Sequence, residues 1–294
     1  MIPGYIIGKK KMIGEGGLKA LTVVLVYVAQ PFMIIAAFQN NAYEPYMLAG
    51  MGWTVLLSFG VLILGVLLAL LIFRIVRTDR DYENSSRVYA LSSVISNSGF
   101  MGIPVIKAML PGNTEALVYS AVFIVIFNVV IWTVGVYVIT GNKQYISLKK
   151  AIFNPPTLAL FVALPLFFAR IALPDWLMNG VNMLGDMPTP LCMIILGIKL
   201  SQIKFVELFN RSGVYLAVLC KLFVIPLFTY LCVYFLPIDG TVRATVYLSM
   251  CMPSASMVLV FCEMFGGDGY AASKTQLLST VLSVLSIPLL GLLL

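Results

Sequence analysis

The sequence predicts an all-α integral membrane protein built from two inverted five-helix repeats. Hydrophobic residues make up 61% and charged residues 11% of the 294-residue chain, whereas soluble domains carry roughly 25% charged residues. Apolar segments recur along the whole chain, most of them near the ~20 residues that a helix needs to cross a bilayer. The fourth and ninth of these segments are interrupted near their centres by proline, glycine and small polar residues.

The first apolar segment, Met1 to Gly8, is too short to cross a bilayer and is followed at once by Lys9-Lys10-Lys11. In a secretory signal peptide the positive charges precede the apolar run, so this order excludes one. We expect these residues to be the end of a first helix that is truncated here.

Nine complete spans are expected after this short segment, each long enough to cross the bilayer. Their predicted ranges are Leu18–Phe38, Met47–Phe73, Arg87–Leu110, Ala116–Ile139, Pro156–Leu173, Leu177–Leu200, Val214–Leu236, Thr241–Phe265 and Tyr270–Leu294.

Lysine and arginine are distributed unequally between the two sides of these spans. Alternate connections hold fourteen of them, against three in the intervening connections, Lys107, Arg170 and Arg243. Because positively charged loops stay in the cytoplasm, the rich side is predicted to be cytoplasmic and the C-terminus at Leu294 to lie outside. The same bias explains the net charge of +7 better than a nucleic-acid partner does.

The polar connection over residues 142–154 divides the chain into two halves, 1–141 and 155–294, of five segments each. Since each half has an odd number of segments, the second must insert upside down relative to the first. Two interrupted segments in corresponding positions of such inverted repeats indicate a transporter whose substrate binds near the bilayer midplane.

The first interruption contains Asn97, Ser98, Gly99, Gly102, Ile103 and Pro104. Glycine and proline weaken or remove intrahelical hydrogen bonds, and in hydrocarbon the freed backbone groups survive only inside protein or beside a wet cavity. We expect the helix to resume at Ile103-Pro104, with its N-terminus available to an anion. The Asn97 amide could contact a carboxylate or cap the broken helix, and these two roles remain open.

The second interruption contains Pro253, Ser254 and Ser256. Pro253 is expected to restart a helix in the same way, which would direct a second helix N-terminus at the midplane. The alternative for either interruption is a kinked packing helix that binds nothing. Gln276, on a polar stripe of the last span, is a further candidate for the substrate path, although such stripes also hydrogen-bond to neighbouring helices.

At these positions the chain resembles the auxin efflux carrier family. The run Asn97-Ser98-Gly99-Phe100-Met101-Gly102-Ile103-Pro104 is similar to that family's crossover motif, and Met187-Pro188-Thr189-Pro190-Leu191, Met252-Pro253, Gly266-Gly267-Asp268 and Ser286-Ile287-Pro288 are similar to its second half. The resemblance covers essentially the whole chain. It implies ten helices in two inverted repeats, broken helices that cross at the substrate site, and an elevator-like transport domain that moves against a dimeric scaffold.

Few charged residues lie inside spans. Asp186 precedes Pro190 by one helical turn, and Lys221 lies within the eighth span. An ionisable group inside a membrane is a functional candidate, so Asp186 could couple transport to protons and Lys221 could attract an anion. Alternatively, Asp186 lies in a wet outer vestibule and Lys221 snorkels or pairs with a neighbouring span.

The chain lacks the residues that metal-binding proteins and intramembrane proteases need. The chain has no histidine, and its five cysteines lie in apolar spans without metal-ligand spacing, so neither a metal site nor a cofactor is expected. An intramembrane aspartyl protease would need a second aspartate beside Asp268, and Asp186 lies towards the opposite face. We therefore expect no enzyme.

These observations predict a secondary transporter in the cell membrane, with a prokaryotic cytoplasmic membrane favoured, that moves a small organic anion. The resemblance implies a dicarboxylate such as malate or malonate, or an auxin-like aromatic acid, and a homodimer. A sodium-coupled symporter of related inverted fold and a channel are the alternatives.

Overall fold

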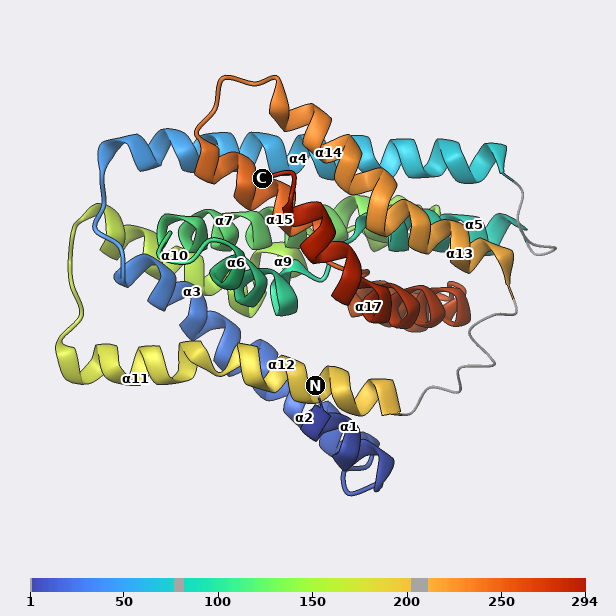
Figure 1. Ribbon diagram of the computed structural model, residues 1–294, viewed down its shortest axis with the longest axis horizontal. Coiled ribbons are helices and arrows are strands. Elements are labelled where there is room, and N and C mark those ends of the chain that lie inside the picture. The colour runs from blue at the N-terminus through green and yellow to red at the C-terminus, as the bar shows by residue number, and fades with distance from the viewer. Residues whose placement is uncertain (1, 77–81, 202–210) are drawn as a thin grey trace.

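The computed structural model describes residues 2–76, 82–201 and 211–294, which form helices and turns without a strand (Figure 1). The helices of the first half are α1(Ile2–Lys9), α2(Glu15–Val24), η1(Leu25–Ala29), α3(Gln30–Gln39), α4(Pro45–Ile75), α5(Tyr82–Val94), η2(Ser98–Gly102), α6(Ile103–Met109), α7(Glu115–Val130), η3(Ile131–Gly135) and α8(Val136–Thr140). Those that follow are η4(Lys143–Tyr145), α9(Leu148–Ile152), α10(Pro155–Phe168), α11(Asp175–Asp186), α12(Pro188–Ser201), α13(Ser212–Leu219), η6(Cys220–Val224), α14(Ile225–Tyr234), α15(Gly240–Cys251), α16(Ser256–Phe265) and α17(Gly269–Gly291).

The described residues contain six helical segments long and apolar enough to cross a membrane. They are Gly16–Gln39, Pro45–Ile75, Glu115–Thr140, Asp175–Ile198, Ser212–Tyr234 and Gly269–Gly291. This supports an integral membrane protein, but with fewer continuous spans than the nine predicted. The predicted spans 87–110 and 241–265 are each divided into shorter helices. Proline weakens the helical hydrogen bonding near both centres, at Pro104 and Pro253, and glycine contributes in the first of the two spans.

The predicted span 156–173 is also shorter than expected. Its helix, α10, has 14 residues and begins where the Asn154 side chain accepts a hydrogen bond from the Thr157 N–H. It ends at Phe168, since Arg170 takes a positive φ of 55° that a right-handed helix cannot continue through. A bend of 42° separates α10 from the preceding η4–α9 segment, so this stretch forms a bent pair of helices.

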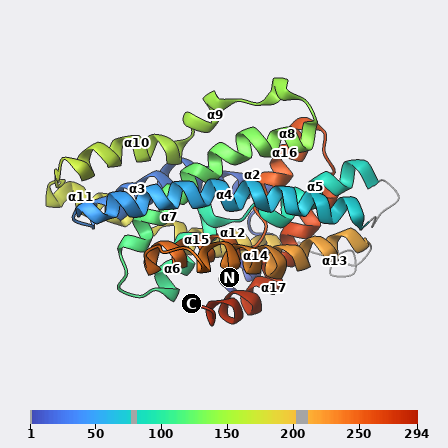
Figure 2. The same ribbon diagram turned by 90° about the horizontal axis from the view of Figure 1, so that it is seen from above.

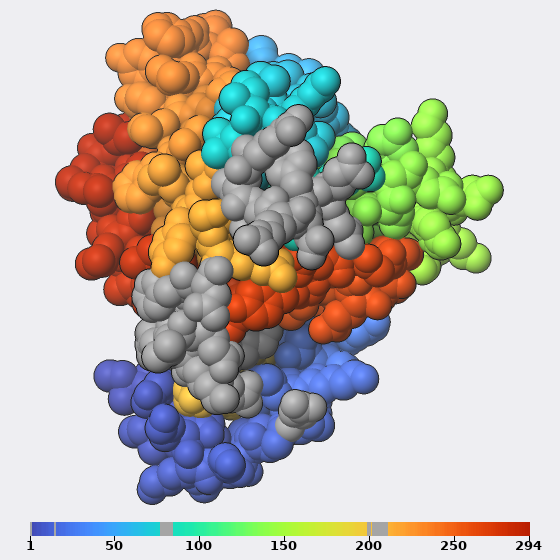
Figure 3. All heavy atoms as spheres, turned by 90° about the vertical axis from the view of Figure 1, so that its right-hand side faces the viewer, coloured from blue at the N-terminus to red at the C-terminus, as the bar shows by residue number. Residues whose placement is uncertain are grey.

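The helices pack in two groups, which lie largely in the lower and upper parts of Figure 1; α10 belongs to the lower group by its packing on α3, although it is drawn at the level of α6 (Figures 1 and 3). In the lower group α1 packs on α12, and α3 packs on α10 and α11. In the upper group α4 packs on α5 and α7, and α15 packs on α7 and α14. The groups meet where α7 contacts α3 and α10 and where η2 contacts α12.

The short helix α1 is held by very close packing on α12. A side chain at Gly4 would overlap the carbonyl oxygen of Ile194, and a Cβ at Gly8 would lie 3.0 Å from the Ile198 Cα. Glycines four residues apart let two helix backbones approach in this way in membranes.

Candidate functional site

The two interruptions pair with each other at the centre of the upper group. Ser96 and Ser254 form an isolated antiparallel β-bridge. On either side of it the Asn97 N–H donates to the Pro253 carbonyl oxygen at 2.8 Å, and the Ala255 N–H donates to the Ile95 carbonyl oxygen at 2.9 Å. Backbone groups that no helix can satisfy are therefore bonded between segments about 150 residues apart, as a buried position requires.

The two restarts agree with the prediction only in part. After the first interruption a wide π turn, η2, begins at Ser98, and the α-helix α6 then begins at Ile103 as predicted, with Pro104 in its first turn. Pro104 has no N–H to give to the preceding turn, and the carbonyl oxygen of Gly99 instead accepts a hydrogen bond from Gln30 Nε2 at 2.6 Å. The π turn and Gln30 together accommodate the proline inside a continuing helix.

After the second interruption the helix resumes at Ser256, three residues beyond Pro253. Pro253 stays in the extended crossing because its carbonyl oxygen pairs with Asn97, and the following Ser254 N–H donates to Ser279 Oγ at 3.1 Å. The first-turn N–H groups of α16, at Ser256 and Met257, have no helical carbonyl to bond.

A cavity of about 180 Å³ lies beside this crossing, between the two groups of helices. Four carboxamides, of Gln30, Asn97, Asn128 and Asn154, line it together with aromatic and aliphatic side chains. The lining residues are Val26, Tyr27, Gln30, Ser96, Asn97, Gly99, Phe100, Ile124, Phe127, Asn128, Trp132, Asn154, Pro155, Pro156, Ala255, Ser256 and Met257. No lysine, arginine, aspartate or glutamate of the described residues is among them.

Asn97 presents its carboxamide to this cavity. Asn97 is 4% exposed, and its amide makes no hydrogen bond to any described residue. It therefore does not cap η2 with its side chain, which was one of the two roles left open by the sequence. A buried carboxamide with two donors and an acceptor to spare favours a ligand there.

Lys221 lies behind the crossing and away from the cavity lining. Its fully buried ammonium donates to the Val94 carbonyl oxygen at 3.1 Å, to Ser96 Oγ at 2.5 Å and to the Met250 carbonyl oxygen at 3.3 Å. Val94 ends α5 and Met250 lies in the last turn of α15. The Lys221 amine thus bonds the crossing strand to the carbonyl ends of two helices, and it does not line the cavity.

Comparisons with known proteins identify the family of the chain. The family model described as "Membrane transport protein" matches residues 1–149 and 144–290 of the chain. The chain belongs to this family, which is that of the auxin efflux carriers. It is therefore a transporter of the membrane, and membership in a transporter family points away from an enzyme.

Two archaeal relatives support the assignment of this auxin efflux carrier family member. An uncharacterized transporter of Methanocaldococcus jannaschii is 26% identical over 307 residues, covering 99% of this chain and 94% of the relative. An uncharacterized transporter of Methanothermobacter thermautotrophicus is 26% identical over 294 residues, covering 97% of this chain and 92% of the relative.

The remaining predicted site residues of this transporter take different places. Ser98, Gly102 and Ile103 are buried in and beside η2, and Pro104 is half-buried in α6; none of these four lines the cavity. Gln276 does not line the cavity, but its Nε2 donates to Oγ of Ser256, which does, at 2.8 Å.

Asp186 lies far out at the end of α11, where its side chain is 74% exposed and pairs with Lys107 at 3.4 Å. It does not line the cavity.

The site residues predicted from the sequence include neither Gln30 nor Asn128. Both line the cavity, and the Asn128 amide donates to the Ile124 carbonyl oxygen at 2.9 Å, which leaves its own oxygen for other partners. A signal for Gln30 was present, since it is a polar residue directly before Pro31 in the middle of an apolar span.

Proposed function

We propose that this transporter is a secondary carrier for small organic anions and that it binds their carboxylate at the crossing of the two interrupted helices. The observation that carries the proposal is the unpaired, buried Asn97 carboxamide in a cavity between the two groups of helices. Its Nδ2 can donate to a carboxylate oxygen in a position where little water competes.

The N-terminus of α16 supplies the second contact in this proposal. Ser256 and Met257 line the cavity, and their N–H groups lie at the positive end of the helix dipole. Partial positive charge from a helix end and amide donors bind an anion without the strong desolvation cost of a buried lysine or arginine. Gln276 would fix the Ser256 hydroxyl beside that site.

The wall of the cavity favours one of the two substrate classes under consideration. Apart from its carboxamides and the hydroxyls of two serines, the lining consists mainly of aliphatic side chains and of aromatic rings such as Phe100, Phe127 and Trp132. A second carboxylate, as in malate or malonate, would be desolvated against these rings without a charged partner. An auxin-like acid, with one carboxylate and an apolar body, would bury its body favourably there.

For the transport step, we propose that one group of helices moves relative to the other, with the cavity between them. The upper group of helices would carry the crossing, while the lower group would form the scaffold, with 1–141 and 155–294 as inverted repeats joined by 142–154. The Gln30–Gly99 hydrogen bond joins the two groups, so an elevator-like movement would have to break it. The scaffold would also hold the two copies of a homodimer together.

The experiment is a thermal-shift and uptake screen on purified protein, first in detergent and then in proteoliposomes. Indole-3-acetate, its neutral amide and malonate separate the contributions of charge, ring and second carboxylate. We expect stabilisation by the aromatic acid, less by malonate and none by the amide. Stabilisation by the neutral amide or by organic cations alone would contradict an anion site.

Two further measurements separate a carrier from its alternatives. Uptake that persists when sodium is replaced by another cation argues against a sodium symporter, and loss of uptake would support one. Conductance in planar bilayers beyond carrier rates would identify a channel.

A further inference from the structure

A second cavity, of about 480 Å³, lies at the end of the molecule that the charge distribution predicts to face outside. It is formed by α14, the first turns of α15, the connection after α6 and the end of α17, which lie together along one edge of the molecule (Figure 2). Its lining residues are Leu110, Asn113, Tyr230, Tyr234, Asp239, Gly240, Thr241, Arg243, Ala244, Tyr247, Leu293 and Leu294. The crossing of the interrupted helices contributes none of them.

Arg243 is the cation of this cavity and has donors to spare. Its one hydrogen bond within the described residues runs from Nη2 to the Leu236 carbonyl oxygen at 3.1 Å, and its Nε is buried without a partner. The guanidinium also lies over the Tyr234 ring, 6.0 Å from its centroid. The nearby Asp239 carboxylate does not pair with it, because it caps α15 by accepting the Thr241 and Val242 N–H groups. The remaining N–H groups of this guanidinium can donate to the oxygens of a phosphate.

Three tyrosines form the wall next to Arg243. The Tyr230 and Tyr247 rings meet edge to face at 5.6 Å, and the Tyr230 and Tyr234 rings lie 5.3 Å apart. Tyr247 donates to the Leu290 carbonyl oxygen, whereas neither the Tyr230 nor the Tyr234 hydroxyl has a hydrogen-bond partner within the described residues. Tyrosine clusters of this kind are enriched at the level of lipid headgroups.

The cavity continues into a lipid-facing apolar surface. Leu227, Leu231 and Tyr234 lie on one face of α14, and all three are exposed, as are Leu285 and Leu289 of the neighbouring α17. Tyr234 belongs both to this face and to the cavity lining. A molecule with a phosphate at Arg243 could therefore extend apolar chains along α14 and α17 without entering the protein core.

From this arrangement we infer that the cavity is a binding site for the phosphodiester of a membrane phospholipid, held by Arg243 and the hydroxyls of Tyr230 and Tyr234. The site is separate from the proposed carboxylate site and does not depend on the substrate. Free inorganic phosphate shares the headgroup chemistry but lacks the chains, so it should bind much more weakly.

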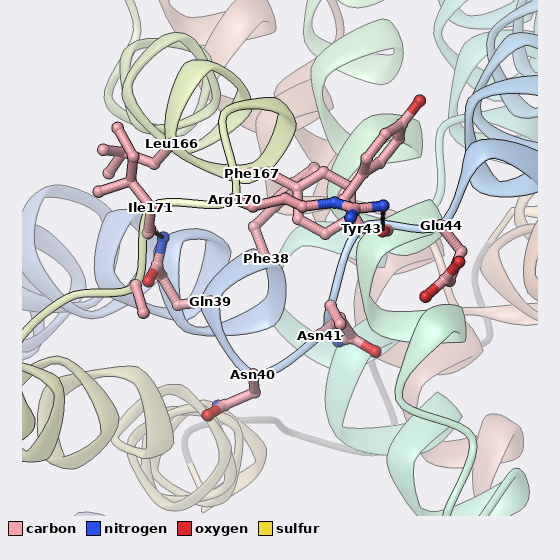
Figure 4. A pocket seen from close by; sticks show the side chains of 12 residues that line it. Phe38, Gln39, Asn40, Asn41, Tyr43, Glu44, Leu166, Phe167, Arg170 and Ile171 are labelled. Carbon is pink, nitrogen blue, oxygen red and sulfur yellow. Dashed lines mark hydrogen bonds between the residues drawn. The ribbon is translucent and has the colours of Figure 1, made fainter.

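Arg170 provides a matched control on the other group of helices. It donates to the Tyr43 carbonyl oxygen at 3.2 Å and lies 5.8 Å from the centroid of the Tyr43 ring, so it makes the same two contacts as Arg243. The cavity around it is lined by the amides Gln39, Asn40 and Asn41 and by Glu44, instead of by a tyrosine cluster that opens onto a lipid-facing helix (Figure 4).

The test measures the unfolding temperature of delipidated full-length protein in neutral detergent with three probes. These are dioctanoyl phosphatidylglycerol, dioctanoylglycerol without the phosphate, and inorganic phosphate without the chains. We expect only the phospholipid to raise the unfolding temperature. R243Q should weaken its apparent affinity about tenfold or more, the loss of a charge-assisted contact, while R170Q should keep the wild-type response.

Each other outcome overturns the inference. An equal shift with dioctanoylglycerol would show an apolar crevice, and an equal shift with inorganic phosphate would show a site for free anions. An unchanged phospholipid response in R243Q would remove Arg243 from the site. Should R243Q not fold, Tyr234→Leu, at an exposed position, should also weaken the phospholipid response, and an unchanged response in that variant would equally contradict the inference.

Discussion

The Lys221 ammonium lies 2.5 Å from the Ser96 hydroxyl oxygen and joins the crossing strand to the ends of α5 and α15. A fully buried lysine whose hydrogen bonds within the described residues all go to neutral oxygens is unusual, because its charged form is costly to bury. Here the electronegative ends of two helices offset that cost. The lysine therefore holds the strand that presents Asn97 to the cavity.

Replacement of this lysine should loosen the crossing. In Lys221→Met the Val94 and Met250 carbonyl oxygens lose their buried donor, which should cost about 1–3 kcal/mol of stability. The measurement is the unfolding temperature by tryptophan fluorescence, with Lys107→Met, whose side chain is 65% exposed, as the control. An unfolding temperature of Lys221→Met equal to that of the wild type would show that the ammonium does not stabilise the crossing.

Asp268 should make stability depend on pH. The residue lies outside the spans, just before α17, and accepts hydrogen bonds from Ser85 Oγ at 2.6 Å, the Ala271 N–H at 2.9 Å and Arg211 Nη1 at 2.6 Å. Burial alone would raise the pKa of its carboxyl, but these donors and the Arg211 charge hold that pKa below its ordinary value. Because the folded pKa is depressed, the stabilisation is present above the unfolded pKa of about 3.9 and is lost as pH falls through the folded value.

Asp268→Asn tests this dependence. The variant should unfold at a lower temperature than the wild type at pH 7, and the difference should shrink as pH falls below about 4. Unfolding temperatures across that pH range give the comparison. A difference that stays constant down to pH 3 would mean that the carboxylate charge is not the source of the stabilisation.

Gly4 should tolerate no side chain where α1 packs on α12. Gly4→Ala would push a methyl group into the Ile194 carbonyl oxygen, and such overpacking typically costs about 1–3 kcal/mol. Gly16→Ala in α2 is the control, since no atom lies within 4 Å of a Cβ there; it should be neutral or slightly stabilising. If both variants unfold at the wild-type temperature, α1 does not pack as described.

The sequence predicted some features of the site because they depend on local chemistry. Proline and glycine in the runs around Asn97 and Pro253 indicated where the helices stop, and the helices do stop there. The start of α6 at Ile103 was predicted, but the π turn from Ser98 and the start of α16 at Ser256 were not, since they depend on pairing between the two strands and on Gln30 and Ser279 from other helices. A local pattern holds no information about those contacts.

Long-range contacts also explain the other differences. The partners of Lys221 come from α5, the crossing strand and α15, and none of them is close to Lys221 in sequence. Arg170 shortens α10 through a positive φ that no residue pattern signals for arginine. By contrast, the all-helical membrane fold followed directly from composition and segment length.

The most direct test of the central proposal is the Asn97→Asp variant in proteoliposomes, measured by uptake of a carboxylate that stabilises the wild type. The substitution keeps the size of the side chain but, when ionised, places a negative charge where the substrate carboxylate should bind. Asn97→Ala, which removes an amide contact worth roughly 0.5–3 kcal/mol, serves as the uncharged comparison. We predict that Asn97→Asp inserts and folds but does not transport the anion. Uptake by Asn97→Asp with wild-type rate and apparent affinity would contradict the proposal.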